Sequence, residues 1–229
     1  LNEKRLESII GLQDKLRLAE DELAQALSLK DLEEAKLKGI GNIIDESYKI
    51  KEQIYQALMQ EFEPDLDDWK AEIERETLTI KFNEPDIFFE SGSATVTAKF
   101  QGILSDFFPR YIRILEPFFD NIREVRIEGH TSSKWETATN EEDAFLENMK
   151  LSQDRTQAIL DYCLRLIGLD ENYSKRIKEK VKTAGFSSTK LKYDYYDRED
   201  EAASRRVEFT IDIDEKHIIQ NINKALTDD

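Results

Sequence analysis

The sequence predicts an α+β protein, with helices packed on a mixed four-stranded sheet and a long helical segment in front of them. Residues 1–62 lack proline and repeat apolar or small residues at alternating spacings of three and four, as coiled coils do. Later segments alternate apolar and polar residues, which is typical of half-buried strands. We expect a coiled-coil stalk at 1–62, a linker or helix at 63–76, an α+β domain at 77–214 and a short helical tail at 215–229.

The helical segment carries two apolar seams. The first comprises Ile9, Leu12, Leu16, Ala19, Leu23 and Ala26, and the second comprises Ile43, Ser47, Ile50, Ile54 and Ala57. Lys30 and Glu33 interrupt the repeat, and Gly39 and Gly41 favour a break or kink between the seams. Two arrangements fit this pattern. One is a parallel coil that joins two copies of the chain, and the other is a pair of antiparallel helices folded on one another or on the domain.

Within the domain, strands are expected at 78–83, 124–129, 181–185 and 206–213, where apolar and polar residues alternate. Helical patterns cover 95–122, with Pro109 and Pro117 dividing or bending the stretch, and 151–166, where Ser152 is a candidate cap. A further short helix is expected at 174–181. The polar stretches 132–147 and 187–204 are expected to be loops.

Composition limits the classes of function. The chain has 33 basic and 49 acidic residues, a net charge of −16, which argues against nucleic-acid binding because that requires a basic surface. The single cysteine, Cys163, excludes an internal disulfide and a cysteine-rich zinc site, and two histidines leave little for a histidine-based metal centre. We therefore expect no metal and no cofactor. The chain has no run of apolar residues long enough for a membrane helix, and it begins Leu-Asn-Glu instead of Met, so we expect any membrane segment to lie upstream.

Four short motifs stand out in the domain. They are Phe89-Glu-Ser-Gly-Ser-Ala, Val125-Arg-Ile-Glu-Gly-His-Thr, Asn148-Met-Lys-Leu-Ser-Gln-Asp-Arg and Ser204-Arg-Arg-Val-Glu-Phe. Each is weak alone, but together they resemble the C-terminal peptidoglycan-binding domain of the OmpA/MotB-like family, in the family's order and over about residues 78–214. The domain is identified as a member of this family, of the stator B-subunit type.

The resemblance implies a site for the diaminopimelate of the peptidoglycan stem peptide. In the family, an aspartate after Gly-His-Thr binds the amine, and the arginine of Leu-Ser-x-x-Arg binds the carboxylate. Arg155 matches the arginine, but Ser132 stands in place of the aspartate and supplies no charge, which would weaken the contact by about 1–2 kcal/mol. Four acids of the following stretch are candidate replacements: Glu136, Glu141, Glu142 and Asp143.

The expected ligand-binding residues are Arg155, Asn148, Thr131, Ser132, Arg205 and Arg206. Strand alternation would put Arg205 and Arg206 on opposite faces, one near the pocket and one in solvent. Asn148 has a second interpretation as a helix cap. Trp135 is either an anchor for its loop or a platform that stacks on a sugar, and His130 is expected to be structural.

No nucleophile, phosphate-loop or metal-ligand motif indicates an enzyme, so the sequence predicts a binding module. The resemblance implies a periplasmic peptidoglycan anchor, tethered to the inner membrane by an upstream segment and working with a MotA-like channel subunit. Such subunits serve flagellar motors and other envelope processes, including anti-phage defence. We also expect a homodimer through the coil. The alternative, favoured by Ser132, is an interaction or dimerisation module that has lost cell-wall binding.

Overall fold

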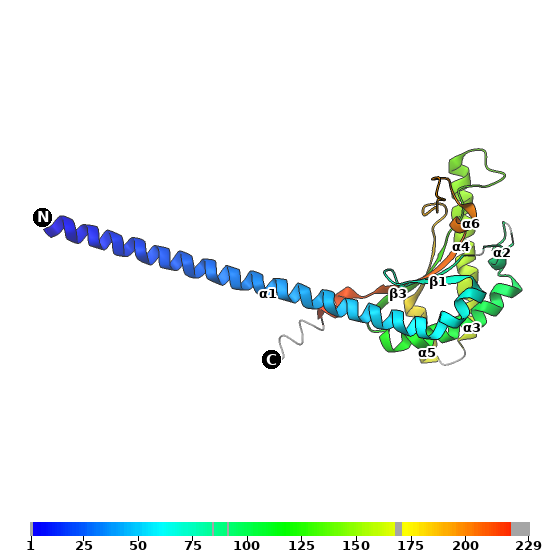
Figure 1. The fold of residues 1–229 in the computed structure, drawn as a ribbon, viewed down its shortest axis with the longest axis horizontal. Coiled ribbons are helices and arrows are strands. Elements are labelled where there is room, and N and C mark those ends of the chain that lie inside the picture. The colour runs from blue at the N-terminus through cyan, green and yellow to red at the C-terminus, as the bar shows by residue number, and fades with distance from the viewer. Residues whose placement is uncertain (1, 84, 91, 168–170, 221–229) are drawn as a thin grey trace. The chain divides into compact units, whose positions relative to one another are not determined.

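The computed structural model describes residues 2–83, 85–90, 92–167 and 171–220, and the side chains of residues 15–83, 87–90, 92–167 and 174–220. Its elements are α1 (Asn2–Trp69), β1 (Ala71–Glu74), β2 (Thr79–Phe82), α2 (Pro85–Phe88), α3 (Ala98–Leu115), the 3₁₀ helix η1 (Glu116–Phe118), β3 (Ile122–Gly129), α4 (Glu141–Leu166), α5 (Glu171–Lys180), β4 (Val181–Gly185), α6 (Glu201–Ser204) and β5 (Val207–Ile213) (Figure 1). Residues 215–220 are also helical, and the rest of the expected tail lies outside the described residues. The α+β class, with helices packed on a mixed sheet behind a long first helix, is confirmed.

The sheet has five strands, in the order β1-β2-β5-β3-β4. The pair β3–β4 is parallel and the other pairs are antiparallel. All four expected strands are present as β2 to β5, so the expected number was wrong by one edge strand, β1. This strand lies in the stretch that we expected to be a linker or helix, and Ile73 pairs with Ile80 of β2. Four residues give too few alternations to distinguish a strand from a turn in the sequence.

Helix α1 runs unbroken from Asn2 to Trp69, so the expected break between the seams is wrong. A glycine costs a helix interior only about 1 kcal/mol, and one exposed proline removes a single hydrogen bond, so Gly39, Gly41 and Pro64 are tolerated. One continuous helix also rules out two antiparallel helices paired with each other. The expected linker at 63–76 is instead the end of α1, the strand β1 and the turn that follows it.

The chain divides into two units, Leu1–Glu46 with Ile219–Asp229, and Ser47–Ile218. In the second unit, the seam residues Ser47, Ile50 and Ile54 are buried, together with Leu58 and Phe62 of the same helix. This part of the expected stalk therefore packs on the α+β domain, as the end of one continuous helix and not as an antiparallel pair. In the first unit, the side chains that are described are exposed, apart from the partly buried residues 39 and 43.

Aromatic residues fill the centre of the domain. Phe107 of α3 lies 5.3 Å from Phe82 and 5.0 Å from Phe209, measured between ring centroids, so the helix packs directly on β2 and β5. Phe62 and Trp69 of α1 lie 5.3 Å and 5.9 Å from the same ring. Each aromatic pair adds about 0.5–1.5 kcal/mol beyond its buried area, which explains why the end of α1 belongs to this core.

Helix α4 begins ten residues earlier than the pattern at 151–166 predicted. Asn140 is its N-cap, because the Asn140 side chain accepts a hydrogen bond of 2.8 Å from the backbone N–H of Asp143. Acidic residues in the first turn are favourable at a helix N-terminus, so a stretch that we expected to be a loop starts the helix. Ser152 is consequently an interior residue and not a cap; its hydroxyl donates to the carbonyl of Met149.

In the part of the chain that the structure describes, no helix combines the length and the apolar character that crossing a membrane requires.

Candidate functional site

A cavity of about 420 Å³ lies where the loop after β3 meets α4 and α6. Its lining includes five of the six residues expected at the site: Thr131, Ser132, Asn148, Arg155 and Arg205. Phe89, Lys134, Trp135, Leu151 and Glu201 complete most of the wall. The structure therefore brings together residues that lie up to 116 positions apart in the sequence.

Two buried hydroxyl residues enter the cavity from the end of β3. The backbone N–H of Thr131 donates to the carbonyl of Ser187 at 3.0 Å, which fixes the chain as it leaves the sheet. Both Thr131 and Ser132 are buried, and the hydroxyl of Thr131 has no hydrogen-bond partner among the described residues. A buried hydroxyl without a partner is costly, so this atom is available to a ligand.

Helix α4 supplies the opposite wall, because Asn148 and Arg155 are seven residues apart and share one helix face. Asn148 is inside the helix, so its interpretation as a cap is wrong. Its Nδ2 instead donates to the carbonyl of Lys134 at 3.1 Å and holds the loop after β3 against the helix.

Arg155 is held in place by backbone groups and one ring. Its Nε donates to the carbonyl of Ser93 at 2.9 Å, and its Nη2 donates to the carbonyl of Glu90 at 3.3 Å. The guanidinium also lies 4.8 Å from the ring centroid of Phe89. These contacts leave Nη1 without a hydrogen-bond partner among the described residues. The side chain is thus held in one orientation, with Nη1 free to donate hydrogen bonds to a ligand.

The charge at this position favours an anion. Burial and the neighbouring charge of Arg205 lower the pKa of Arg155 to about 10, so the guanidinium remains charged at neutral pH although its surroundings disfavour the charge. The Nε of Arg205 is buried and has no hydrogen-bond partner within the described part of the chain. A carboxylate placed between the two guanidinium groups would relieve their repulsion and accept the free donors.

The cavity also contains acidic groups on its rim. Of the four acids considered as replacements for the family's aspartate, Glu136 lines the cavity, whereas Glu141, Glu142 and Asp143 lie in the first turn of α4. Glu201 of α6 lines it too, but its carboxylate is paired with Lys134 at 2.5 Å. Glu136 is exposed and is the acid with room to meet a ligand ammonium.

Trp135 lines the cavity and is partly buried. Its indole N–H donates to the hydroxyl of Thr137 at 3.0 Å, and its carbonyl accepts from the backbone N–H of Ala138 at 3.1 Å. The tryptophan is therefore tied into its own loop, as the anchor interpretation expects, while part of its surface remains on the cavity wall.

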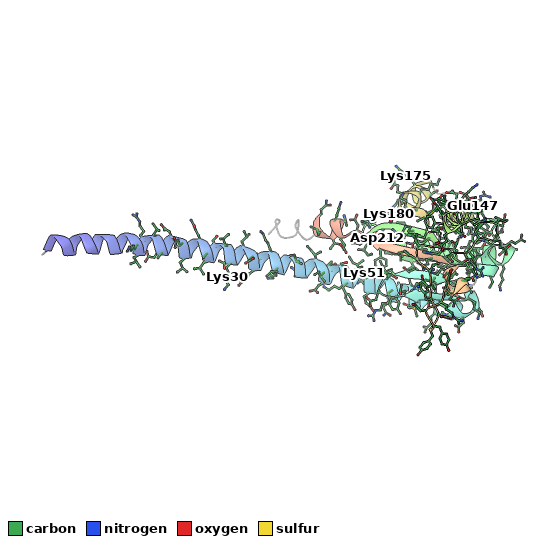
Figure 2. The ribbon with its side chains drawn as sticks, turned by 90° about the horizontal axis from the view of Figure 1, so that it is seen from above. Lys30, Lys51, Glu147, Lys175, Lys180 and Asp212 are labelled. Atoms are coloured by element: carbon green, nitrogen blue, oxygen red, sulfur yellow. The ribbon has the colours of Figure 1, made fainter. Side chains whose placement is uncertain are left out.

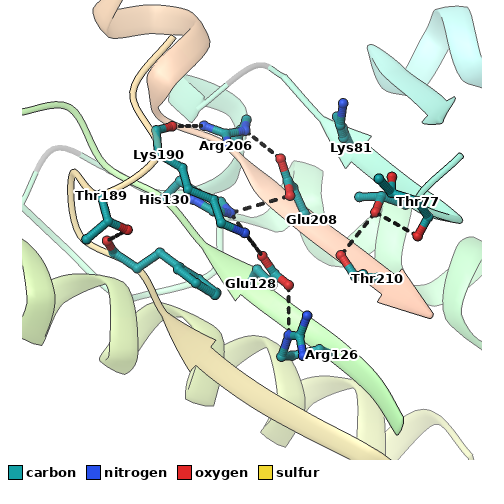
Figure 3. A network of polar contacts seen from close by, with 12 residues as sticks. Thr77, Lys81, Arg126, Glu128, His130, Thr189, Lys190, Arg206, Glu208 and Thr210 are labelled. Carbon is teal, nitrogen blue, oxygen red and sulfur yellow. Dashed lines mark hydrogen bonds and ion pairs between the residues drawn. The ribbon is translucent and has the colours of Figure 1, made fainter. Parts of the chain in front are cut away.

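Arg206 lies outside the cavity of about 420 Å³, and it is not solvated either. Its Nε donates to Glu208 at 2.6 Å, and its Nη1 donates to the carbonyls of Lys190 and Ser204, both at 3.1 Å (Figure 3). The side chain is only 4% exposed. Alternation does separate Arg205 from Arg206, but the second arginine is buried in a polar network. We therefore leave Arg206 out of the candidate site.

His130 belongs to the same network. Its Nε2 lies 3.5 Å from a carboxylate oxygen of Glu128 and 3.5 Å from one of Glu208, and its ring stacks on Phe186 (Figure 3). Its backbone N–H donates to the carbonyl of Arg206. The contacts agree with a structural role for this histidine.

Glu128, His130 and Glu208 are close enough for a metal ion, since one ligand atom of each lies within 4.8 Å of the others. The surrounding charges argue against one. Glu128 is already bonded to Arg126 at 2.8 Å and to Lys190 at 3.1 Å, and Arg206 is bonded to Glu208. Burial would raise the pKa of Glu128, but the close approach of His130, Arg126 and Lys190 outweighs it and lowers the value to about 2. Three cations neutralise two carboxylates, so the cluster is a closed ion network.

Sequence reasoning missed several residues of the wall. Phe89 and Leu151 lie inside motifs that we recognised, although no role was assigned to them. Lys134 and Glu201 gave no signal, because their approach depends on how two irregular segments fold against each other.

Comparison with known proteins agrees with this architecture. The family model described as the OmpA family matches residues 88–206, which contain nearly the whole cavity wall. The chain is 44% identical over 159 residues to the Zorya protein ZorB of Escherichia coli, covering 69% of this chain and 67% of that protein. The crystal structure of a MotB-like protein from Desulfovibrio vulgaris has a similar fold, with a TM-score of 0.52 and 16% sequence identity, covering 74% of this chain and 95% of that one. Because the OmpA family model matches more than half of its residues and its α+β fold agrees with that match, the chain belongs to the OmpA family.

Proposed function

We propose that the protein is a non-catalytic peptidoglycan-binding anchor, the periplasmic part of a membrane-tethered, stator-like subunit of the MotB type. The observation that carries the proposal is the pair of guanidinium groups, Arg155 and Arg205, in one cavity with unused donors. A carboxylate of the diaminopimelate stem peptide is the ligand group that this geometry suits. The OmpA family membership and the MotB-like fold support the same reading.

The ammonium of the same ligand would meet a different environment from the one in the family. Ser132 stands in the sequence where the family has its aspartate. It is buried at the cavity wall, where its hydroxyl can accept a hydrogen bond. Glu136, on the same loop, supplies the negative charge that Ser132 lacks. The stem peptide is thus held by two arginines at one end and by a hydroxyl and an exposed carboxylate at the other.

The N-terminal part of α1 is suited to a parallel homodimer. Leu16, Leu23, Leu37 and Ile44 recur at multiples of seven residues and are each about 60–65% exposed, with Lys30 in the intermediate position. Lys30, which is labelled on α1 in Figure 2, forms an ion pair with Glu34 of its own helix at 3.7 Å. A dimer would bury this seam and present two cell-wall sites, and a MotA-like channel subunit would be the membrane partner.

Sedimentation with purified peptidoglycan tests the proposed function. Arg155→Ala should reduce the bound fraction about tenfold, because it removes a group that binds the carboxylate of the ligand, while circular dichroism shows that the fold is retained. Arg165→Ala is the matched control, since Arg165 is exposed on the same helix and does not line the cavity. Arg155→Lys should restore binding only in part, because an ammonium cannot make a two-pronged contact.

Ser132→Asp distinguishes the anchor from the alternative. If Ser132 faces the ligand ammonium, the added carboxylate should tighten binding of a soluble diaminopimelate-containing peptide several-fold in calorimetry. Equal, negligible binding by the wild type, Arg155→Ala and Ser132→Asp would refute the anchor. The domain would then be an interaction module that has lost cell-wall binding.

A further inference from the structure

A hairpin of residues 192–200 displays exposed aromatic side chains. Tyr193 pairs with Glu199 across the hairpin, and the side chains of Tyr195 and Tyr196 at its tip are 95% and 73% exposed. The two tip rings form an edge-to-face pair with centroids 5.4 Å apart. Exposed aromatic groups gathered at one place on a soluble domain commonly mark a contact surface. We call residues 192–200 the tyrosine hairpin.

The tip of the tyrosine hairpin is fixed by one carboxylate. Asp194 accepts hydrogen bonds from the backbone N–H groups of Tyr196 and Arg198, at 2.8 Å and 3.0 Å. The Arg198 side chain bonds the same carboxylate at 3.0 Å and 2.7 Å, and its guanidinium lies 5.2 Å from the ring centroid of Tyr196. A fixed backbone lowers the entropy that binding would otherwise cost. The tyrosines are therefore presented by an ordered support.

The base of the hairpin is joined to the cavity wall. Glu199 accepts a hydrogen bond of 2.9 Å from the backbone N–H of Ser133, and it also bonds the Ser133 hydroxyl. Lys134 and Glu201, which form an ion pair, both line the cavity. The tyrosine hairpin is thus bonded to the loop that forms one side of the cavity, and a ligand that extends from the cavity on this side would meet the hairpin.

The charge of the hairpin narrows the choice of partner. Residues 192–200 contain four acidic and two basic residues, a net negative charge that disfavours nucleic acid, anionic lipid and acidic protein segments. A sugar ring carries no such charge. Its apolar face suits a tyrosine ring, and its hydroxyl groups suit the phenol oxygen.

We propose that Tyr195 and Tyr196 stack on a sugar ring of the glycan strand to which the bound stem peptide is attached. This inference rests on the proposed function and adds the glycan to it. The hairpin tip and the stem peptide have similar lengths. The tip lies two to three residues beyond the Tyr193–Glu199 pair, about 7–10 Å at the rise of a strand. Diaminopimelate is the third residue from the sugar, and three extended residues span about 10 Å.

Three ligands separate the glycan contact from the peptide contact: the soluble stem peptide without sugar, the same peptide attached to its disaccharide, and purified sacculi. For the double variant Tyr195→Ala/Tyr196→Ala, we expect about tenfold weaker binding of the disaccharide-peptide in calorimetry, equivalent to about 1.4 kcal/mol, and unchanged binding of the stem peptide. Sedimentation with sacculi should fall in parallel. Tyr195→Phe/Tyr196→Phe should retain the ring contact and most of the affinity.

Tyr48→Ala is the matched control, because Tyr48 is 59% exposed on α1 and belongs neither to the hairpin nor to the cavity wall. Equal affinity of the double alanine variant and the wild type for the disaccharide-peptide would overturn the stacking and leave the anchor function intact. Loss of stem-peptide binding in that variant would also overturn it, since the hairpin would then only shape the cavity. If the wild type binds none of the three ligands, the proposed function fails and the inference fails with it.

Discussion

Replacing Gly129 with alanine tests whether the site depends on the close approach of α4 to β3. A Cβ atom at Gly129 would lie 2.8 Å from the backbone carbonyl oxygen of Ser152 and 2.8 Å from Cγ2 of Thr156. Ordinary contact begins near 3.4 Å, so α4 or β3 must move by about 0.6 Å. The oxygen of Ser152 is a backbone atom and cannot rotate away from the added Cβ. Overpacking of this kind typically costs about 1–3 kcal/mol.

The displacement should reach the site, because α4 carries both Asn148 and Arg155. We expect Gly129→Ala to lower the free energy of unfolding in urea by about 1–3 kcal/mol and to weaken binding of the diaminopimelate-containing peptide several-fold. Gly102→Ala is the control: Gly102 lies within α3 with nothing within 4 Å of an added Cβ, so it should be neutral or stabilising by up to about 1 kcal/mol. A Gly129→Ala variant with wild-type stability and affinity would refute the reasoning.

The ion network should make stability sensitive to acid. The close approach of His130 and of the neighbouring cations outweighs burial and lowers the pKa values of Glu128 and Glu208 from 4.5 to about 2. Their stabilisation is therefore complete above pH 4.5 and is lost as pH falls towards 2, and Glu208→Gln should flatten this decline in urea titrations. Leu16→Asp with Leu23→Asp should turn a dimer into a monomer in analytical ultracentrifugation, because each change would bury a charge in the seam. Leu18→Asp lies off the seam and should leave the dimer intact. A monomeric wild type would contradict the proposed coil. Because the network already neutralises its carboxylates, neither chelator nor added Zn²⁺ should change the Tm, and a zinc-dependent rise would show a metal site there.

The α+β core was predictable because its signals are local and repeated. The strands β2, β3, β4 and β5 alternate apolar and polar residues, and four motifs fix their order around the helices. The edge strand β1 was missed because four residues carry too little pattern. The start of α4 was missed because an acidic stretch fits both a solvated loop and the first turn of a helix. Asn140, which caps that turn, is the residue that decides between them.

The residues of the site were expected from the resemblance to the OmpA/MotB-like family, and spacing explains why some of them lie together. Asn148 and Arg155 share a helix face because they are seven residues apart, and Thr131 and Ser132 follow a strand that must end beside that helix. Contacts that depend on irregular segments gave no such signal. Lys134 and Glu201 meet at the rim only because the loop after β3 and the tyrosine hairpin are joined by Ser133 and Glu199.

Two adjacent arginines between α6 and β5 connect the stability of the sheet to the chemistry of the cavity. The alternation of side chains along an extended chain places Arg205 and Arg206 in different surroundings, but it does not determine which of them contacts the ligand. Partners decide this. Arg206 has Glu208 and two backbone carbonyls, and its own carbonyl accepts from His130 one residue before Thr131. Its bonds therefore hold the strand end that positions the cavity wall. The buried Nε of Arg205 has no hydrogen-bond partner among the described residues, which leaves this arginine suited to an external anion.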